Sequence, residues 1–323
     1  MKIDDVISSE TAPKPLRWID IENPEPHELR AIALQYDLPS QAVQDCLEPD
    51  HFPKFESFGA LNFMIVRVYD VNATSDADTV QELTRKIAVF ESGSLVITIH
   101  RSAQVQLSEI KDQWRERMAK GESIEAHHIL LSILTGAIQS YQKPMVANRN
   151  LLEDFEVKVF KHDGDTFEDG YFLKRRASAF KRMIRMTIDL LPRISGQYKD
   201  HVSLVQDARE NGERLYAYSE EFHENITSLV GLQLALSNHR LTVASFKTNE
   251  VMRILTVFSV FFMPLNLITG IYGMNFEHMP ELKWPHGYYI ALTVMFAMTA
   301  LILTYFKRKG VLDAPEVESS PKA

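Results

Sequence analysis

Residues 254–282, ILTVFSVFFMPLNLITGIYGMNFEHMPEL, change from uncharged and mostly apolar to polar within a few positions. No charged residue occurs from Ile254 to Gly273, and two acids, Glu277 and Glu281, follow soon afterwards. A helix of about 20 apolar residues is long enough to cross a hydrocarbon core of ~30 Å. The stretch therefore predicts a membrane-spanning helix that ends in an abrupt polar loop.

A second uncharged run, GYYIALTVMFAMTALILTYF, follows the loop from Gly287 to Phe306. Together the two runs predict a transmembrane hairpin in the lipid bilayer, with spans at about 251–273 and 287–306. A pair of buried helices in a soluble protein is the alternative.

Basic residues predict how the hairpin is oriented. Arg240, Lys247 and Arg253 precede the first run and 307–309 (KRK) follow the second, whereas Lys283 alone lies between the runs. Since lysine and arginine accumulate on the cytoplasmic side, we expect both termini in the cytoplasm. The chain is then a multi-pass protein of the inner or plasma membrane.

Composition narrows the function classes. The 323 residues carry a net charge of −8, which argues against a nucleic-acid partner because phosphate binding needs a basic surface. One cysteine, Cys46, excludes an internal disulfide framework. The N-terminal stretch MKIDDVISSETAPKPLRW lacks the apolar region of a signal peptide. No phosphate-binding loop or catalytic constellation stands out, so we expect neither an enzyme nor an organic cofactor.

The pattern upstream of the spans predicts an α/β domain followed by helices. Within residues 1–124, strands are expected at 63–70, 85–92 and 94–100, and helices at 27–37 and 105–120. Residues 125–250 are helical: one helix over 125–162, bent at Pro144 if at all, one over 172–191 interrupted by Pro192, and a long helix entering the membrane. The seam of this long helix is Leu215, Tyr218, Phe222, Ile226, Leu229, Leu232 and Leu236. The hairpin then occupies 251–312 and a polar tail 313–323.

A stripe of small, polar and methionine residues follows the first span at helical spacing. Asn266 is its most informative member, because an amide in lipid lacks hydrogen-bond partners and should face protein or water. Close packing between helices also enriches such residues, so packing and a water-lined path remain alternatives. Read at a period near 3.5, the stripe consists of Asn249, Met252, Leu255 or Thr256, Ser259, Met263, Asn266 and Gly270.

The Gly273-Met274-Asn275 sequence closes the span and has two interpretations. One is a helix cap, since glycine and asparagine tolerate left-handed backbone geometry. The other is a ring of Asn275 amides, one per subunit, whose oxygens hold hydrated Mg²⁺. Glu277 and Glu281 would concentrate cations outside, or belong to an ordinary solvated loop.

These residues resemble the CorA family of divalent-cation transporters. The resemblance rests on Gly273-Met274-Asn275 after Tyr272, on 279–282 (MPEL), on 247–252 (KTNEVM) and on 262–265 (FMPL). Weaker similarity occurs at 18–20, 44–45, 53–56 and 96–101. The resemblance implies a funnel-shaped homopentamer in which Asn275 forms the outer selectivity ring. It also implies that six residues of the stripe line the pore, namely Asn249, Met252, Leu255, Met263, Asn266 and Gly270. Met252 and Leu255 would form its hydrophobic constriction.

The resemblance also implies gating by cytoplasmic Mg²⁺ bound between subunits. Asp45 falls where one regulatory carboxylate is expected, although a solvated helix acid explains it equally well. The family's second regulatory carboxylate, expected on the long helix before the first span, has no counterpart here. Counting back from Asn249 without gaps places Arg214 at its position. Asp207, Glu210 or Glu213 could substitute. Asn266 is a second difference from the pattern of the CorA family, in which threonine is familiar at that turn of the helix.

Several functions remain open. The stripe has neither imidazole nor thiolate, which a dedicated zinc path would favour, so Mg²⁺ is preferred over Co²⁺, Ni²⁺ or Zn²⁺. A membrane-tethered metal sensor that conducts nothing is the alternative from another class. The direction of transport is not set by the sequence.

Overall fold

The computed structural model describes residues 1–9, 16–122, 124–161, 167–198 and 202–310. The chain divides into two compact units, Met1–Ala235 and Leu236–Ala323. The predicted boundaries at 124 and 250 remain predictions, and the predicted polar tail at 313–323 lies outside the described residues.

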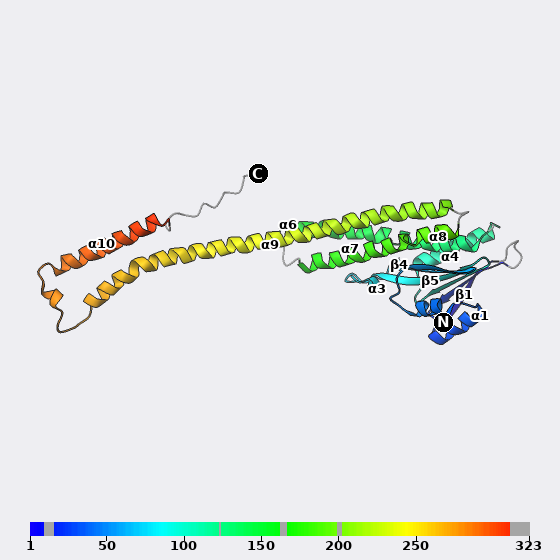
Figure 1. The fold of residues 1–323 in the computed structure, drawn as a ribbon, viewed down its shortest axis with the longest axis horizontal. Helices are drawn as coiled ribbons and strands as arrows, with labels where there is room; N and C mark the ends of the chain where they lie inside the picture. Colours follow the sequence, from blue (N-terminus) through cyan, green and yellow to red (C-terminus); the bar gives the residue numbers. More distant parts are fainter. Residues whose placement is uncertain (10–15, 123, 162–166, 199–201, 311–323) are drawn as a thin grey trace. The chain divides into compact units, whose positions relative to one another are not determined.

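A six-stranded mixed sheet organises the first unit (Figure 1). Its order is β1-β2-β6-β5-β4-β3, with β2 and β6 parallel and every other neighbouring pair antiparallel. The strands at 63–70, 85–92 and 94–100 are confirmed, while β1, β2 and β3 were not predicted. The strands are β1 Lys2–Ser9, β2 Leu16–Glu22, β3 Lys54–Phe58, β4 Leu61–Tyr69, β5 Thr84–Ser92 and β6 Leu95–His100.

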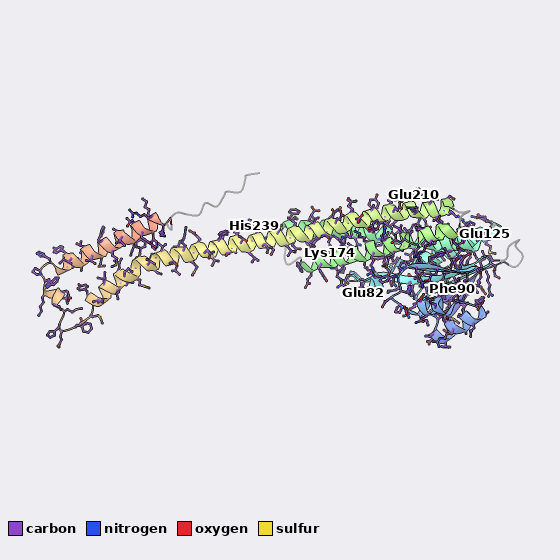
Figure 2. The ribbon with its side chains drawn as sticks, in the orientation of Figure 1. Glu82, Phe90, Glu125, Lys174, Glu210 and His239 are labelled. Carbon is purple, nitrogen blue, oxygen red and sulfur yellow. The ribbon has the colours of Figure 1, made fainter. Side chains whose placement is uncertain are left out.

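Helices cover both faces of this sheet. Because successive strand residues point to opposite faces, Trp18 and Ile19 enter different cores. Ile19 packs with α1 (Pro26–Gln35) and α2 (Ser40–Leu47). The rings of Phe63 and Phe90 lie 4.7 Å apart in the same core. Figure 2 labels Phe90 on the sheet. Trp18 packs on the other face with α4 (Val105–Ala119), α5 (Ala126–Gln139), α7 (Phe167–Ile188) and α8 (Leu191–Gln197). The predicted sheet covered by helices is confirmed.

The single helix predicted at 125–162 is wrong. The structure has α5 and then α6 (Gln142–Lys161), with the break at Ser140 and Tyr141 instead of at Pro144. The Ser140 hydroxyl accepts a hydrogen bond from the Tyr69 backbone N–H at 2.9 Å. The buried Tyr141 hydroxyl donates to the Arg67 carbonyl at 2.9 Å. Both contacts reach β4, which lies far from Ser140 and Tyr141 in the sequence. The position of the break therefore depends on tertiary structure.

The helix predicted at 172–191 begins earlier and ends sooner. It is α7, Phe167–Ile188, and Pro192 lies in the first turn of α8 instead of interrupting a helix. A proline is tolerated there because the first helical N–H groups have no partner within the helix. The short α3, Val80–Leu83, was also not predicted.

The predicted long helix is confirmed as α9, Val202–Tyr272, which has 71 residues. Leu215, Phe222 and Ile226 of its predicted seam are buried, but Tyr218 is 58% exposed. The second unit contains the end of α9, a 3-10 turn η2 (Pro280–Lys283) and α10 (Gly287–Arg308). Both α9 and α10 are long and apolar enough to cross a membrane.

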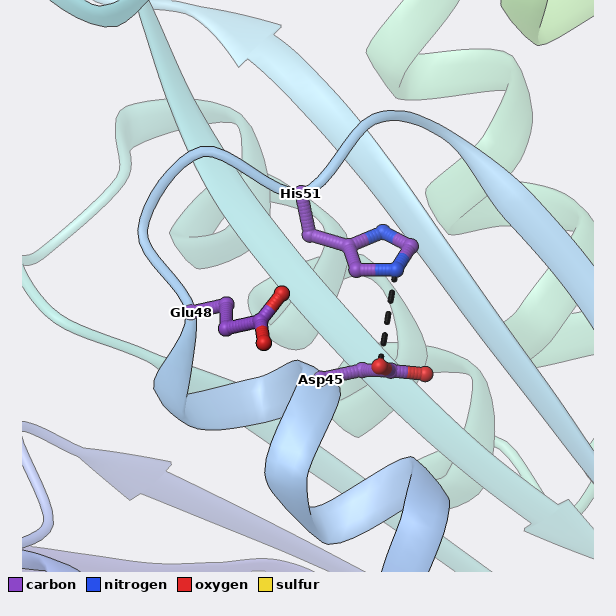
Figure 3. A group of neighbouring side chains, drawn as sticks. All are labelled: Asp45, Glu48 and His51. Carbon is purple, nitrogen blue, oxygen red and sulfur yellow. Dashed lines mark ion pairs between the residues drawn. The ribbon is translucent and has the colours of Figure 1, made fainter.

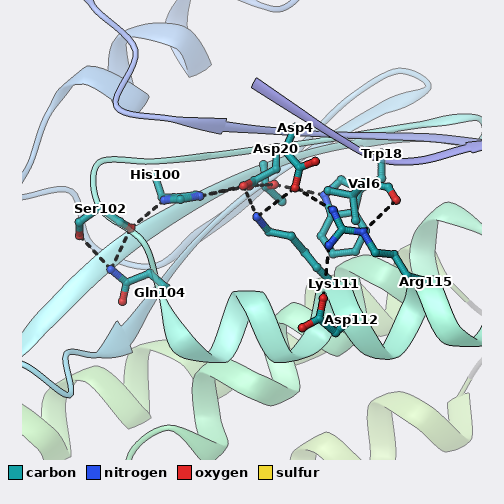
Figure 4. A network of polar contacts seen from close by, with 11 residues as sticks. Asp4, Val6, Trp18, Asp20, His100, Ser102, Gln104, Lys111, Asp112 and Arg115 are labelled. Carbon is teal, nitrogen blue, oxygen red and sulfur yellow. Dashed lines mark hydrogen bonds and ion pairs between the residues drawn. The ribbon is translucent and has the colours of Figure 1, made fainter. Parts of the chain in front are cut away.

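A buried ionic network joins the sheet to α4 (Figure 4). The Asp20 carboxylate, 3% exposed as a residue, accepts hydrogen bonds from Lys111 and from the Thr98 hydroxyl. The His100 Nε2 atom lies 3.1 Å from it. Burial would raise the pKa of Asp20, but these partners together lower it below its ordinary value.

Replacing Asp20 with asparagine is expected to lower the free energy of unfolding by about 3 kcal/mol, because the partly buried Lys111 ammonium loses its close carboxylate partner and keeps only Asp4 at 3.9 Å. The stabilisation from Asp20 is present above the ordinary carboxyl pKa of 3.8 and is lost as pH falls through the lowered value. Thermal unfolding of the full chain measures the effect. The control Asp5→Asn removes the exposed pair with Arg17 and should cost at most ~1 kcal/mol. Equal losses in both variants would contradict this role for Asp20.

Candidate ion pathway and metal site

One face of the membrane segment of α9 carries the contact with α10. The Phe261 ring lies 5.9 Å from the Phe306 ring, centroid to centroid. The half-buried positions of this segment recur on the same face as Phe261. They are Arg253, Val257, Phe261, Pro264, Leu265 and Ile268.

The predicted stripe lies on the opposite face of α9. At about 100° per residue, Met263 is ~200° around the helix from Phe261 and Gly270 is ~180° from it. Every member of the stripe is exposed in the single chain. Met263 is 71% exposed and Leu255 is 59% exposed. The structure thus brings the six predicted residues to one uncovered face.

The polar groups of this face differ in how they are satisfied. The Ser259 hydroxyl donates to the Leu255 carbonyl at 2.8 Å, and the Thr256 hydroxyl donates to the Met252 carbonyl at 2.7 Å. The side-chain amide of Asn266 makes no hydrogen bond to any described residue. An unsatisfied amide in hydrocarbon costs several kcal/mol (~2–7). Asn266 therefore needs water or another subunit beside it.

Geometry argues against the helix-cap interpretation of Gly273-Met274-Asn275. The Gly273 N–H donates to the Thr269 carbonyl at 2.9 Å, so the last turn closes in the ordinary way. Neither Gly273 nor Asn275 has a positive φ. The left-handed cap that would explain these residue types is absent at this described turn, and Asn275 is exposed just beyond it.

The loop after Asn275 is held by backbone contacts and not by its acids. The Gly287 N–H donates to the Trp284 carbonyl at 3.1 Å, which links η2 to the start of α10. A Cβ on Gly287 would lie 2.7 Å from the Glu281 carbonyl oxygen, so only glycine fits. Glu277 and Glu281 are exposed.

Residues at the helix ends fit two membrane interfaces. Trp284, Tyr288 and Tyr289 are exposed at the loop end of α10, and Lys307 and Arg308 lie in its last turn. Aromatic rings are typical of the membrane–water boundary, and basic residues are typical of the cytoplasmic boundary.

Asp45 lies elsewhere, in the last turn of α2 in the first unit. Its carboxylate accepts a hydrogen bond from Lys54 at 2.6 Å and lies 3.5 Å from His51 Nε2. Burial would lower the pKa of Lys54, but Asp45 and Glu56 together raise it. Burial raises the pKa of the neighbouring Cys46 thiol to about 12, so this sulfur is not a thiolate ligand at neutral pH.

The stalk acids considered as partners of Asp45 make local contacts. Glu213 pairs with Arg209 at 2.8 Å, and Glu210 accepts a hydrogen bond from Gln206 at 2.9 Å. Arg214 donates to Asn211 at 2.8 Å. These contacts single out no carboxylate on α9 as a partner for Asp45.

Comparison with known proteins decides the family. The family described as CorA-like Mg²⁺ transporter protein matches residues 13–308. The chain belongs to this CorA-like family.

Two curated relatives and one solved structure are similar along most of the chain. The cobalt/magnesium transport protein CorA of Thermotoga maritima is 26% identical, over 83% of this chain and 75% of that protein. The protein of the same name from Methanocaldococcus jannaschii is 24% identical, over 91% of each chain. The complete structure of the M. jannaschii CorA magnesium transporter superposes with a TM-score of 0.63 at 22% identity, covering 94% of both chains. This likeness confirms the predicted CorA-like fold, and CorA-family transporters are membrane proteins.

Sequence reasoning missed two residues beside Asp45. Glu48 and His51 each place a ligand atom near the Asp45 carboxylate, all within 4.8 Å of one another. The spacing Asp-x-x-Glu-x-x-His was the available signal. It was weak, because His51 lies in a loop after α2 ends at Leu47.

Proposed function

We propose that this chain forms a homopentameric channel that carries Mg²⁺ across the membrane, driven by the membrane potential. The observation that carries the proposal is the uncovered stripe of α9, which leads to the exposed Asn275. Two helices cannot enclose a pore, so several copies must supply one stripe each. In the pentamer Met252 and Leu255 form a hydrophobic constriction, and cytoplasmic divalent cations gate it.

Selectivity in this proposal comes from neutral oxygens. Mg²⁺ prefers oxygen ligands and loses its water reluctantly, so a ring of Asn275 amides suits the hydrated ion. Carboxylates in the same ring would bind more tightly and slow release, whereas conduction needs weak sites. Glu277 and Glu281 raise the local cation concentration outside.

Uptake then needs no ATP. An elementary charge crossing 100 mV gains about 2.3 kcal/mol, so a divalent ion gains about 4.6 kcal/mol. The predicted orientation, with both termini in the cytoplasm, makes the Asn275 ring the external entrance.

Two alternatives are tested by the same experiment. Both the T. maritima and the M. jannaschii relatives carry cobalt in their names, so Co²⁺ is the first competitor for the path. A membrane-tethered sensor that conducts nothing is the second alternative.

Reconstituted full-length protein in liposomes loaded with a Mg²⁺-sensitive dye tests the proposal. We expect Mg²⁺ entry that increases as the interior is made more negative, and five chains per particle by native mass spectrometry. Added Co²⁺, Ni²⁺ and Zn²⁺ rank the ions by competition. Absence of divalent entry at every potential would favour the tethered sensor instead.

A further inference from the structure

Asp45, Glu48 and His51 form a compact group of three metal-ligand side chains at the end of α2 (Figure 3). Their ligand atoms lie within 4.8 Å of one another, and among the described residues no other group of three meets this condition. Figure 3 shows the three side chains converging from the last turn of α2 and the loop after it. We propose that this group, within a single chain, binds a first-row transition-metal ion such as Co²⁺, Ni²⁺ or Zn²⁺.

The His51 ring is oriented for this role. Its Nδ1 atom lies 2.9 Å from the Phe52 carbonyl oxygen, which can only accept a hydrogen bond. In the neutral ring Nδ1 therefore carries the proton, and the Nε2 lone pair points toward Asp45 Oδ1 at 3.5 Å. A histidine that donates one ring N–H to a backbone carbonyl and offers the other nitrogen is the usual arrangement at metal sites.

Three cations fix the backbone that carries the ligands. The Lys86 ammonium donates to the carbonyls of Asp45 at 2.7 Å and Cys46 at 2.8 Å, and also to that of Glu48. The Arg67 guanidinium donates to the carbonyls of Pro49 at 2.9 Å and His51 at 3.2 Å. The third cation, Arg101, donates to the Leu47 carbonyl at 2.9 Å. The segment 45–51 is thus held at six carbonyls, which favours a preorganised site.

Lys54 is the built-in competitor of the metal. Its ammonium lies 2.6 Å from Asp45 Oδ2 and 3.0 Å from Glu56 Oε2. A divalent ion would displace it from Asp45, and Glu56 remains as its second partner. The two carboxylates of Asp45 and Glu48 then balance the double charge of the ion, with open positions left for water.

The donor set selects the class of metal. One imidazole and two carboxylates suit Zn²⁺, Co²⁺ and Ni²⁺, whereas Mg²⁺ prefers an all-oxygen shell. The proposed site therefore differs in ion preference from the proposed Mg²⁺ path, and its occupancy does not depend on conduction.

Co²⁺ titration of tag-free, full-length protein in detergent tests the site. The Asn275→Ala background removes the proposed pore ring, so bound Co²⁺ is not counted there. We expect one equivalent per chain, a visible Co²⁺ absorption band typical of nitrogen ligation, and retention of Co²⁺ in a large excess of Mg²⁺. His51→Ala should weaken binding at least tenfold, since even outer-shell changes cost about 10–100-fold. The control His27→Ala changes an exposed histidine in α1 and should leave Co²⁺ affinity unchanged.

Lys54→Gln is the decisive variant, because it should tighten Co²⁺ binding several-fold by removing the competing cation. A gain in affinity cannot arise from loss of folding. Unchanged or weaker binding in Lys54→Gln, or equal Co²⁺ absorption in wild type and His51→Ala, would overturn the site. Dye-based Mg²⁺ uptake is measured separately, so failure of the proposed channel remains distinguishable.

Discussion

Asn275→Ala is expected to abolish selective Mg²⁺ uptake or reduce it at least about tenfold, because the ring loses the oxygens that hold the hydrated ion. The side chain is exposed beyond the last turn of α9, and the turn does not depend on its conformation. Loss of the amide should therefore leave the chain folded. Dye-loaded liposomes at a fixed negative potential measure the effect.

Two further variants locate the cause of that loss. Asn150→Ala removes an exposed amide from α6 and should conduct like the wild type. Asn275→Asp keeps the oxygens but adds charge, so we expect Mg²⁺ to bind more tightly and to pass more slowly. Wild-type uptake in Asn275→Ala would contradict the selectivity ring.

The membrane half of the fold follows directly from the sequence. Lipid leaves few alternatives for an uncharged run, because the backbone must satisfy its own hydrogen bonds, and a helix is the simplest way to do so. The side-chain amide of Asn266 likewise needs a hydrogen-bond partner, so the face of the helix that carries it was predictable as one that meets protein or water. The break at Ser140 and Tyr141 was not predictable, because it depends on hydrogen bonds to Tyr69 and Arg67, which are remote in sequence.

The group of Asp45, Glu48 and His51 was also predictable only in part. The resemblance to the CorA family pointed to Asp45 alone. His51 joins it only because the chain turns after Leu47. That turn is fixed by Lys86 and Arg67 of the sheet and by Arg101, which directly follows β6. No local pattern shows that Lys54 occupies the Asp45 carboxylate. Local periodicity found the stripe, whereas the ligand group required tertiary structure.

Phenylalanine at Gly270 should block Mg²⁺ uptake by more than about tenfold, because five rings would fill the proposed path. A Cβ at Gly270 meets no heavy atom within 4 Å, and its φ is not left-handed. The chain itself therefore tolerates a side chain there, and helix propensity favours it by up to ~1 kcal/mol. Any loss must arise between subunits. Proteoliposome flux measures Mg²⁺ uptake, and native mass spectrometry of the same sample measures pentamer assembly.

This variant also separates the two interpretations of the stripe. If the small residues serve close packing, phenylalanine should break the pentamer, and flux and assembly should be lost together. A water-lined path predicts an intact pentamer without flux, with partial flux in Gly270→Ala. The control Leu301→Phe adds bulk to a position of α10 that is 68% exposed, and it should change neither flux nor assembly. Wild-type flux through Gly270→Phe would place the ion path away from this face of α9, since a conduit lined by Gly270 cannot admit five aromatic rings and remain open.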